Sequence, residues 1–477
     1  MNVKDRGEKL NNSKDVGIIR RLLSSRFFPF ITAVVVVGCY YLSWDMVTIW
    51  YMGLCGTAIL LLLDDVTPLI SLFLFMNIMI SWKNSPSVTA GNSDFYFQPA
   101  VLAQICVVIG LLVIVIIIKT VRSIKRGNFK LTPAFWGLCE FALAMILNGL
   151  FSQGYNVMNL VYGLFMAFFF LGIFVLGSAN IKVNSQTFER IAWGFIALSV
   201  CLILELAVAY LTYDGLIADG RINRGKLMFG WGIYNTMGML FTISLPSAGY
   251  LAIKYKNGWM FTAYLIILTL CAYLTLSRQT ILVASIIAVL CLMAILVKVK
   301  NRFVHCAVII LLLGVTVVLC YVFNDLIKAT LANLADNFLS GSGRIDLWKL
   351  GLEYFAQSPI LGVGFFVPVN GDPGFTGLDI IPRMYHNTVI QLLATGGLVA
   401  LAAYAVHRTQ TAISYFINPS LDRSYIAITI VALLLLNLLD NHLFYILPTL
   451  VYSMLVAVLI NSENTTSGEG VKYHYEN

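Results

Sequence analysis

Long apolar stretches without a single charged residue recur along this chain of 477 residues, for example at 100–118, 280–297 and 303–323. Each is long enough for a helix that crosses the hydrocarbon core of a bilayer, which takes about 20 residues. Inside a bilayer every backbone polar group needs an internal partner, so runs of this kind form transmembrane helices. They are too long for the alternating segments of an outer-membrane barrel.

The composition agrees with this reading, because 59% of the residues are hydrophobic and only 11% are charged, against about 25% charged residues in an ordinary soluble domain. It excludes a soluble enzyme, a disordered protein and a receptor with a single anchor. We predict an all-α polytopic membrane helix bundle with about fourteen (12–14) transmembrane helices. The expected spans are 27–44, 47–63, 66–81, 99–118, 132–151, 156–177, 191–211, 235–253, 258–275, 280–297, 303–323, 387–406, 425–439 and 443–461.

These spans divide the chain into five parts: a basic tail at 1–26, a transmembrane bundle at 27–323, a long loop at 324–386, C-terminal transmembrane helices at 387–461 and a second tail at 462–477. Most Lys and Arg residues fall in alternate connecting segments, beginning with the first tail. By the positive-inside rule this predicts that both termini are cytoplasmic and that the long loop is extracytoplasmic.

The topology also explains the net charge of +8, so nucleic acid is not an expected partner. The basic tail is interpreted as a topology anchor, with docking on anionic lipid or on a biosynthetic protein as the alternative. The nine cysteines lie in or at the edge of apolar runs and form no C-x-x-C pair. We interpret them as buried, inert thiols.

The long loop is predicted to contain two short amphipathic helices on the outer membrane surface, separated by Gly341-Ser342-Gly343. Apolar residues recur at helical spacing on both sides of this break. They are Ile327, Leu331, Leu334 and Phe338, and then Ile345, Trp348, Leu352 and Phe355. From Pro359 to Pro382 the chain is rich in Gly and Pro, which is typical of an ordered loop.

Nine Lys and Arg residues lie in segments predicted to be outside, against the positive-inside pattern, and the candidate ligands among them are Arg221, Arg224, Arg278 and Arg344. Arginine is costly at the membrane boundary, and its fork matches phosphate oxygens in a bidentate way. Such a cluster therefore favours an anionic ligand. A headgroup anchor or a salt bridge is the alternative for each of them.

His386 is the candidate base, because it directly follows the long loop at the predicted start of an outer-facing helix. The helix macrodipole disfavours a protonated imidazole there, and a neutral histidine can accept a proton from a sugar hydroxyl. A capping histidine is the alternative. The predicted outer segments contain no D-x-D and no carboxylate pair at metal-ligand spacing. No P-loop, GxSxG or HExxH pattern occurs. Neither a metal nor a cofactor is predicted.

Several segments resemble the signature of the bacterial O-antigen ligase/polymerase family. They are Ser342-Gly343-Arg344 with Trp348, the turn Ser358–Gly364, and His386-Asn387-Thr388 with Gln391 and Gly396-Gly397. The turn Leu276-Ser277-Arg278 is similar to the Ser-Arg turn of that family. Arg224, followed by Phe229 and Asn235, resembles its earlier arginine motif, and Arg221 is a competing match. The resemblance covers residues 215–410 and is most specific in 340–400.

The resemblance implies glycosyl transfer on the outer face of the bacterial cytoplasmic membrane. A glycan would leave an undecaprenyl-diphosphate carrier and join an acceptor glycan hydroxyl, with inversion and without a metal. It implies that Arg224, Arg278 and Arg344 bind the diphosphate and that His386 activates the acceptor. Arg221 and Asn387 are additional candidates. The expected surroundings are the lipid bilayer and other biosynthetic membrane proteins, including a chain-length regulator.

A polymerase of lipid-linked repeat units is the favoured activity, because fourteen spans exceed the dozen typical of the ligases. A ligase with a different acceptor is the alternative. A lipid-linked oligosaccharide flippase is a further alternative, but it should show two similar seven-span halves and no long outer loop. A peptidoglycan glycosyltransferase of the shape-and-division type would use an acidic base in its outer loop, where His386 is better placed.

Overall fold

The computed structural model describes residues 14–80, 98–152, 157–218, 220–339, 343–366 and 383–463. Within them a helical segment corresponds to each of the fourteen expected spans. The first seven are α3 (Phe28–Tyr41), α4 (Asp45–Leu62), α5 (Pro68–Ile80), α7 (Pro99–Lys125), α8 (Pro133–Phe151), the continuous α9 (Val157–Ala167), η1 (Phe168–Gly172) and α10 (Ile173–Asn180), and α11 (Ser185–Thr212). The others are α12 (Tyr234–Lys254), α13 (Trp259–Leu274), α14 (Arg278–Lys298), α15 (Arg302–Val322), α18 (Thr388–Ile417), α19 (Leu421–Asn437) and α20 (Ile446–Asn461).

In the described part of the chain, nine helices are long and apolar enough to cross a membrane, or ten if the bent pair Gly17–Leu23 and Phe28–Tyr41 is one span. Strand structure there is limited to two short antiparallel hairpins between α11 and α12. They are β1 (Ile217–Ala218) with β2 (Arg221–Ile222), and β3 (Met228–Phe229) with β4 (Gly232–Ile233). The prediction of an all-α polytopic membrane bundle is confirmed.

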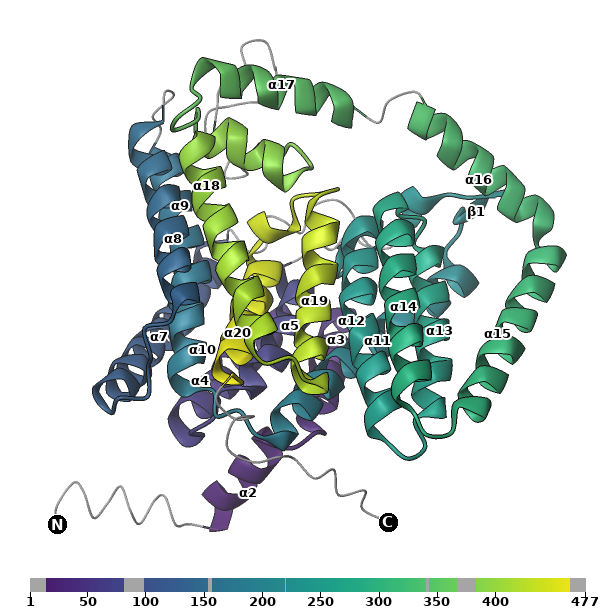
Figure 1. Ribbon diagram of the computed structural model, residues 1–477, viewed down its shortest axis with the longest axis horizontal. Helices are drawn as coiled ribbons and strands as arrows, with labels where there is room; N and C mark the ends of the chain where they lie inside the picture. The colour runs from purple at the N-terminus through teal and green to yellow at the C-terminus, as the bar shows by residue number, and fades with distance from the viewer. Residues whose placement is uncertain are drawn as a thin grey trace.

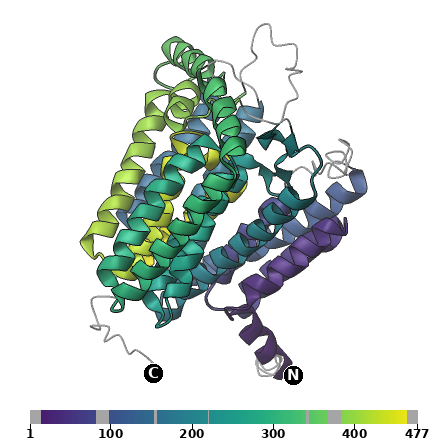
Figure 2. The ribbon, with the colours of Figure 1, turned by 90° about the vertical axis from the view of Figure 1, so that its right-hand side faces the viewer.

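Most of the helices stand side by side as a bundle (Figures 1 and 2). Among the nine long candidate spans the most enclosed is α12, of whose apolar window 89% is buried. In α20 every residue from Leu447 to Ile460 is buried. At the edge of the bundle α15 has only 6% of its window buried (Figure 1). A helix that is apolar on all sides and unburied in the protein faces lipid, so α15 belongs to the lipid boundary.

The two ends of the bundle differ. Across one end, the upper one in Figure 1, lie α16 (Asn324–Leu339) and α17 (Arg344–Gln357), which occupy the segments where two amphipathic helices are expected. We call this the loop end. The opposite end carries the short helix α2 (Lys14–Leu23), and we call it the α2 end.

Near the loop end α18 is broken at Gly397, which has a φ of 61°. The break leaves backbone groups of α18 without partners inside the helix, and the Pro359–Gly364 turn forms hydrogen bonds with them. The amides of Val363 and Gly364 donate to Ala394 and Thr395 at 2.9 and 3.0 Å, and the amide of Leu398 donates to Pro359 at 2.8 Å. A Cβ at Gly397 would overlap the Ile360 carbonyl. Glycine at these positions therefore allows the backbone of the turn to contact the backbone of α18. The contact fixes the turn against the helix that His386 precedes.

Candidate active site

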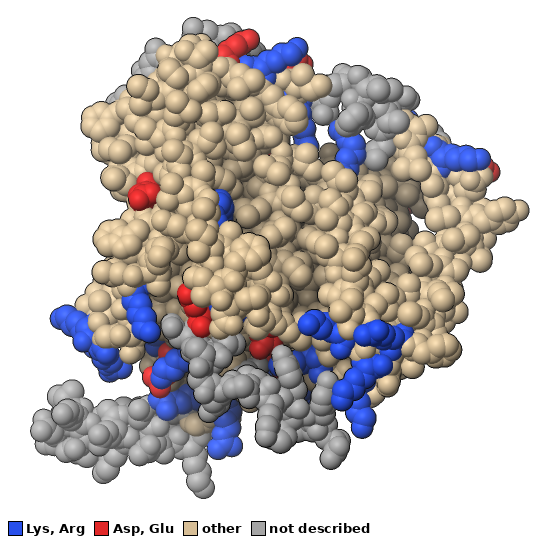
Figure 3. Space-filling view, viewed as in Figure 1, with Lys and Arg blue, Asp and Glu red and all other residues tan. Residues whose placement is uncertain are grey.

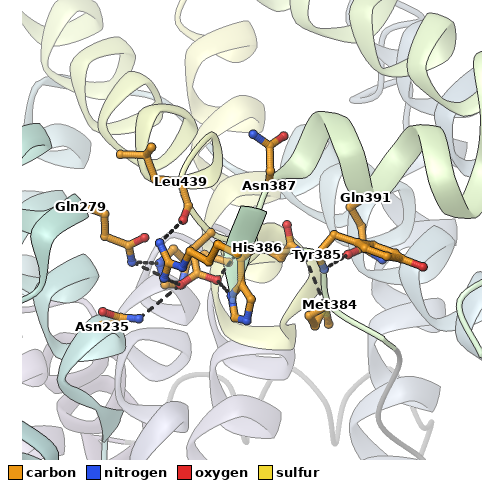
Figure 4. Close-up of polar contacts among 12 residues, drawn as sticks. Asn235, Gln279, Met384, Tyr385, His386, Asn387, Gln391 and Leu439 are labelled. Atoms are coloured by element: carbon orange, nitrogen blue, oxygen red, sulfur yellow. Dashed lines mark hydrogen bonds and ion pairs between the residues drawn. The ribbon is translucent and has the colours of Figure 1, made fainter. Parts of the chain in front are cut away.

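A buried carboxylate organises the loop end. Asp440 lies in the turn between α19 and the short helix η3 (His442–Phe444), and only 6% of its side chain is exposed. One oxygen, Oδ1, lies 2.7 Å from Nδ1 of His386 and accepts the amide of Asn441 at 2.9 Å (Figure 4). A short contact of this kind fixes the orientation of the imidazole ring.

The other carboxylate oxygen of Asp440 is surrounded by donors from three more helices. Arg344, at the start of α17, lies 3.5 Å from Oδ2 and also donates to the Leu439 carbonyl at 2.8 Å. The side-chain amides of Asn235 in α12 and Gln279 in α14 lie 3.4 Å from the same oxygen (Figure 4). Asp440 thus ties α12, α14 and α17 to the end of α19.

These neighbours decide the ionisation of Asp440. Burial by itself would raise the pKa of the carboxyl group. The hydrogen bond to His386 and the nearby imidazoles of His442 and His386 outweigh burial and hold the pKa of Asp440 below its usual range. Asp440 is therefore a carboxylate at neutral pH, and it can stabilise a positive charge on His386.

His386 has the geometry of an oriented base. With Nδ1 held by Asp440, Nε2 forms no hydrogen bond to a described residue, and 34% of the side chain is exposed. The backbone of His386 has a φ of 52°, which is uncommon for a residue with a side chain. Such strain costs about 1–3 kcal/mol and persists where the surroundings require it. Here the backbone conformation of His386 directs the ring to Asp440, and the next residue, Asn387, caps the start of α18.

The helix cap that was the alternative role for His386 is made by Asn387. Its Oδ1 accepts the amides of Val389 and Ile390 at 2.9 and 3.1 Å, and its Nδ2 donates to the Leu438 carbonyl. The side chain points away from the Asp440 cluster (Figure 4). Asn387 thus holds the start of α18 and does not reach the reacting groups.

Three of the four predicted arginines lie close together. Arg278 begins α14 and interacts electrostatically with both Arg224 and Arg344. Arg224, in η2 (Arg224–Lys226), stacks on the Tyr234 ring at 4.8 Å and donates to the Leu276 carbonyl at 3.3 Å. Leu276 itself has a φ of 55°, so a second strained residue stands at the turn before Arg278. Three guanidinium groups at one place attract an anion with several charged oxygens.

Arg221 is not part of this group. It lies exposed in β2, and no polar contact joins its side chain to the other arginines among the described residues. The structure therefore brings Arg224, Arg278, Arg344 and His386 to one place and leaves Arg221 outside. Ser342 and residues 367–382 of the Gly- and Pro-rich loop lie outside the described residues.

Sequence reasoning missed the role of Asp440. The available signal was the polar triplet Asp440-Asn441-His442, which interrupts one long apolar run. An acid in such a run is a functional candidate by default. His442 belongs to the same cluster: burial lowers its pKa, and Gln279 donates to its Nε2 at 3.1 Å. Among the described residues no group of three or more His, Cys, Asp or Glu side chains is arranged to hold a metal ion.

Comparison with protein-family models gives one match. Residues 263–405 match the family described as O-antigen ligase. The match confirms the resemblance to the O-antigen ligase/polymerase family, and it points to glycosyl transfer by an integral membrane protein that uses lipid-linked glycans. No curated protein matches the chain.

The matched region extends from α13 into α18. It includes Arg278, Arg344 and His386, while Arg224 and Asp440 lie outside it. The cluster at the loop end is thus completed by segments before and after the matched region. Packing of α12 against α14 and α19, and of α19 against α14 and α18, brings these segments together.

Proposed function

We propose that this protein polymerises lipid-linked glycan repeat units for a surface polysaccharide such as O-antigen, capsule or exopolysaccharide. It would transfer a glycan from undecaprenyl diphosphate to an acceptor sugar hydroxyl on the outer face of the cytoplasmic membrane. The observation that carries this proposal is the contact between His386 and Asp440 beside three arginines. It combines a base with an anion site in one cluster, as transfer from a diphosphate requires.

His386 would act as the general base. Its Nδ1–H donates to Asp440, which leaves the Nε2 lone pair for the acceptor hydroxyl. The hydroxyl oxygen attacks the anomeric carbon as its proton passes to Nε2. The bond between that carbon and the diphosphate oxygen breaks, and its electron pair leaves with the diphosphate. Attack opposite the leaving group inverts the anomeric centre. Asp440 stabilises the imidazolium that forms.

The arginines would bind the departing diphosphate. Negative charge develops on its oxygens as the sugar bond breaks, and fixed guanidinium groups stabilise that charge without reorganisation. Arg278 and Arg224 are held at the turn that contains Leu276. Arg344 shares its donors with Asp440 and Leu439, so it links the anion site to the base. In this role the arginines replace a divalent cation.

A reconstituted assay tests the proposal. The purified protein receives an undecaprenyl-diphosphate-linked repeat unit and no other substrate, and the products are separated by size. A ladder of longer lipid-linked chains is the expected result. If product forms only after a separate acceptor is added, the protein is a ligase instead. Movement of the substrate between leaflets without any new bond would contradict both activities and indicate a flippase.

The same assay tests independence from metal ions. We expect the rate to survive EDTA, because guanidinium groups provide the positive charge that a metal would provide. A rate that EDTA removes and Mg²⁺ restores would contradict the proposed role of the arginines.

A further inference from the structure

A second group of basic side chains surrounds a cavity at the α2 end. The cavity has a volume of about 560 Å³ and lies where the C-terminal ends of α4, α7, α10 and α20 meet. Its lining includes six basic residues: Arg20, Lys119, Arg122, Arg126, Lys130 and Lys182. Asp64 and Glu463 are the acidic residues of the lining. Lys and Arg side chains gather along this edge of the molecule (Figure 3).

Lys119 and Lys182 have structural partners around the cavity. Lys119 donates to the carbonyls of Leu60 and Leu63, at 2.9 and 2.5 Å, and so neutralises the negative end of α4. Lys182 forms an ion pair with Asp64 at 3.5 Å. These two residues help to hold the helix ends together.

Arg122, Arg126 and Lys130 form no ion pair and donate no side-chain hydrogen bond to any residue that the structure describes. All three are exposed along the end of α7 and the turn after it. The hydroxyl of Ser178, on the opposite wall, is buried and has no hydrogen-bond partner in the described part of the chain. The cavity therefore offers several unused donors to an anion.

One wall of the cavity is apolar and continues onto the lipid-facing surface. Leu61 and Ile118 belong to the lining and are 61% and 41% exposed. They lie on α4 and α7, and only 11% of the apolar window of α7 is buried. Donors inside the cavity and apolar side chains at its rim suit an amphiphile, with its charged group inside and its acyl chains along α7.

We propose that this cavity binds the phosphate group of an anionic phospholipid. Basic pockets between helices at the cytoplasmic side of a membrane favour such headgroups. The topology predicted above places the α2 end there. The site is separate from the cluster at the loop end, because it involves other helices and the opposite end of the bundle. A tightly held lipid would join α7, which is little buried, to the body of the bundle.

The test compares two triple variants of the full chain. Arg122→Gln/Arg126→Gln/Lys130→Gln removes the unused cations of the cavity. Lys298→Gln/Lys300→Gln/Arg302→Gln removes the same charge from the α14–α15 turn, which does not line it. Each protein is reconstituted in phosphatidylcholine vesicles with a graded fraction of spin-labelled phosphatidylglycerol, and the motionally restricted lipid is measured. At about 1 kcal/mol for each basic residue, the first variant should lose about 100-fold in affinity for the restricted lipid.

The control variant should retain the affinity of the wild-type protein. Equal losses in both variants would show attraction by surface charge in general and would overturn the proposal, as would no loss in either. Competition by inorganic phosphate separates the two sources of a phosphate group. If inorganic phosphate by itself displaces the labelled lipid, the cavity binds free anions and the phospholipid assignment is wrong. If only phosphatidylglycerol displaces it, the assignment is supported.

Discussion

The two ends of this bundle both gather basic residues, but they hold them differently. At the loop end two of the arginines are held by named partners: Arg344 contacts Asp440 and Leu439, and Arg224 contacts Leu276. At the α2 end Arg122 and Arg126 are exposed, and their side chains have no partner among the described residues. Donors held by neighbouring groups can stabilise charge that develops in a reaction, whereas exposed donors without such partners mainly attract charge that is already present. The difference predicts that the two ends respond differently when arginine is replaced by lysine.

The largest effect should come from His386→Ala. This change removes the proposed base while leaving Asn387 to cap α18, so the fold should persist. We expect transfer in the reconstituted assay to fall by about 10²–10⁴-fold, the usual contribution of general base catalysis. Circular dichroism and the thermal unfolding midpoint serve as controls for folding. A folded variant with the wild-type rate would exclude His386 as the base.

Asp440→Asn should give the second-largest loss of transfer. The amide keeps the volume of the side chain but removes the charge that stabilises a protonated His386. We expect kcat to fall about 100-fold, with a smaller change in KM, and the pH profile to change shape. Asp422→Asn is a matched control, since Asp422 contacts Tyr250 and Lys254 in another part of the molecule. An unchanged pH profile with reduced stability alone would show that Asp440 is only structural.

Arginine-to-lysine changes separate the two ends most directly. Arg278→Lys keeps the charge but loses the fork, so transfer should fall about tenfold or more. The pair Arg122→Lys/Arg126→Lys should leave both the transfer rate and the lipid affinity near those of the wild type, because charge is sufficient there. If Arg278→Lys also behaves as the wild type, Arg278 is a headgroup anchor and the two ends do not differ in this respect.

The smallest effect concerns stability and pH. Burial lowers the pKa of His442, so the unfolded chain takes up a proton that the folded chain refuses below about pH 6.5, the ordinary value. This contribution to stability is present above that pH and declines as the pH falls, by up to about 1.4 kcal/mol for each pH unit. We expect His442→Gln to reduce the fall of the unfolding midpoint between about pH 7.5 and about pH 5.5. An identical fall in both proteins would assign the acid sensitivity to other groups.

Much of the fold was accessible from local patterns in the sequence. Runs such as 303–323 are apolar enough to form spans wherever they lie, and Asn387 caps α18 through contacts within three residues. The motif positions Arg278, Arg344 and His386 were also identified from local spacing, and the family match includes all three. A signal of this kind needs no knowledge of how the helices pack.

The contacts at the two ends could not be predicted in the same way. His386 and Asp440 are 54 residues apart in the sequence and meet only because α19 returns beside α18. The choice of Arg224 over Arg221 likewise depends on which side chain the hairpin turns toward Leu276. The cavity at the α2 end exists because four helices end at the same level. The length of an apolar run determines that a segment is a membrane-spanning helix, but the bilayer solvates all apolar faces alike. Which helices become neighbours, and which polar residues they bring together, was therefore decided by tertiary packing.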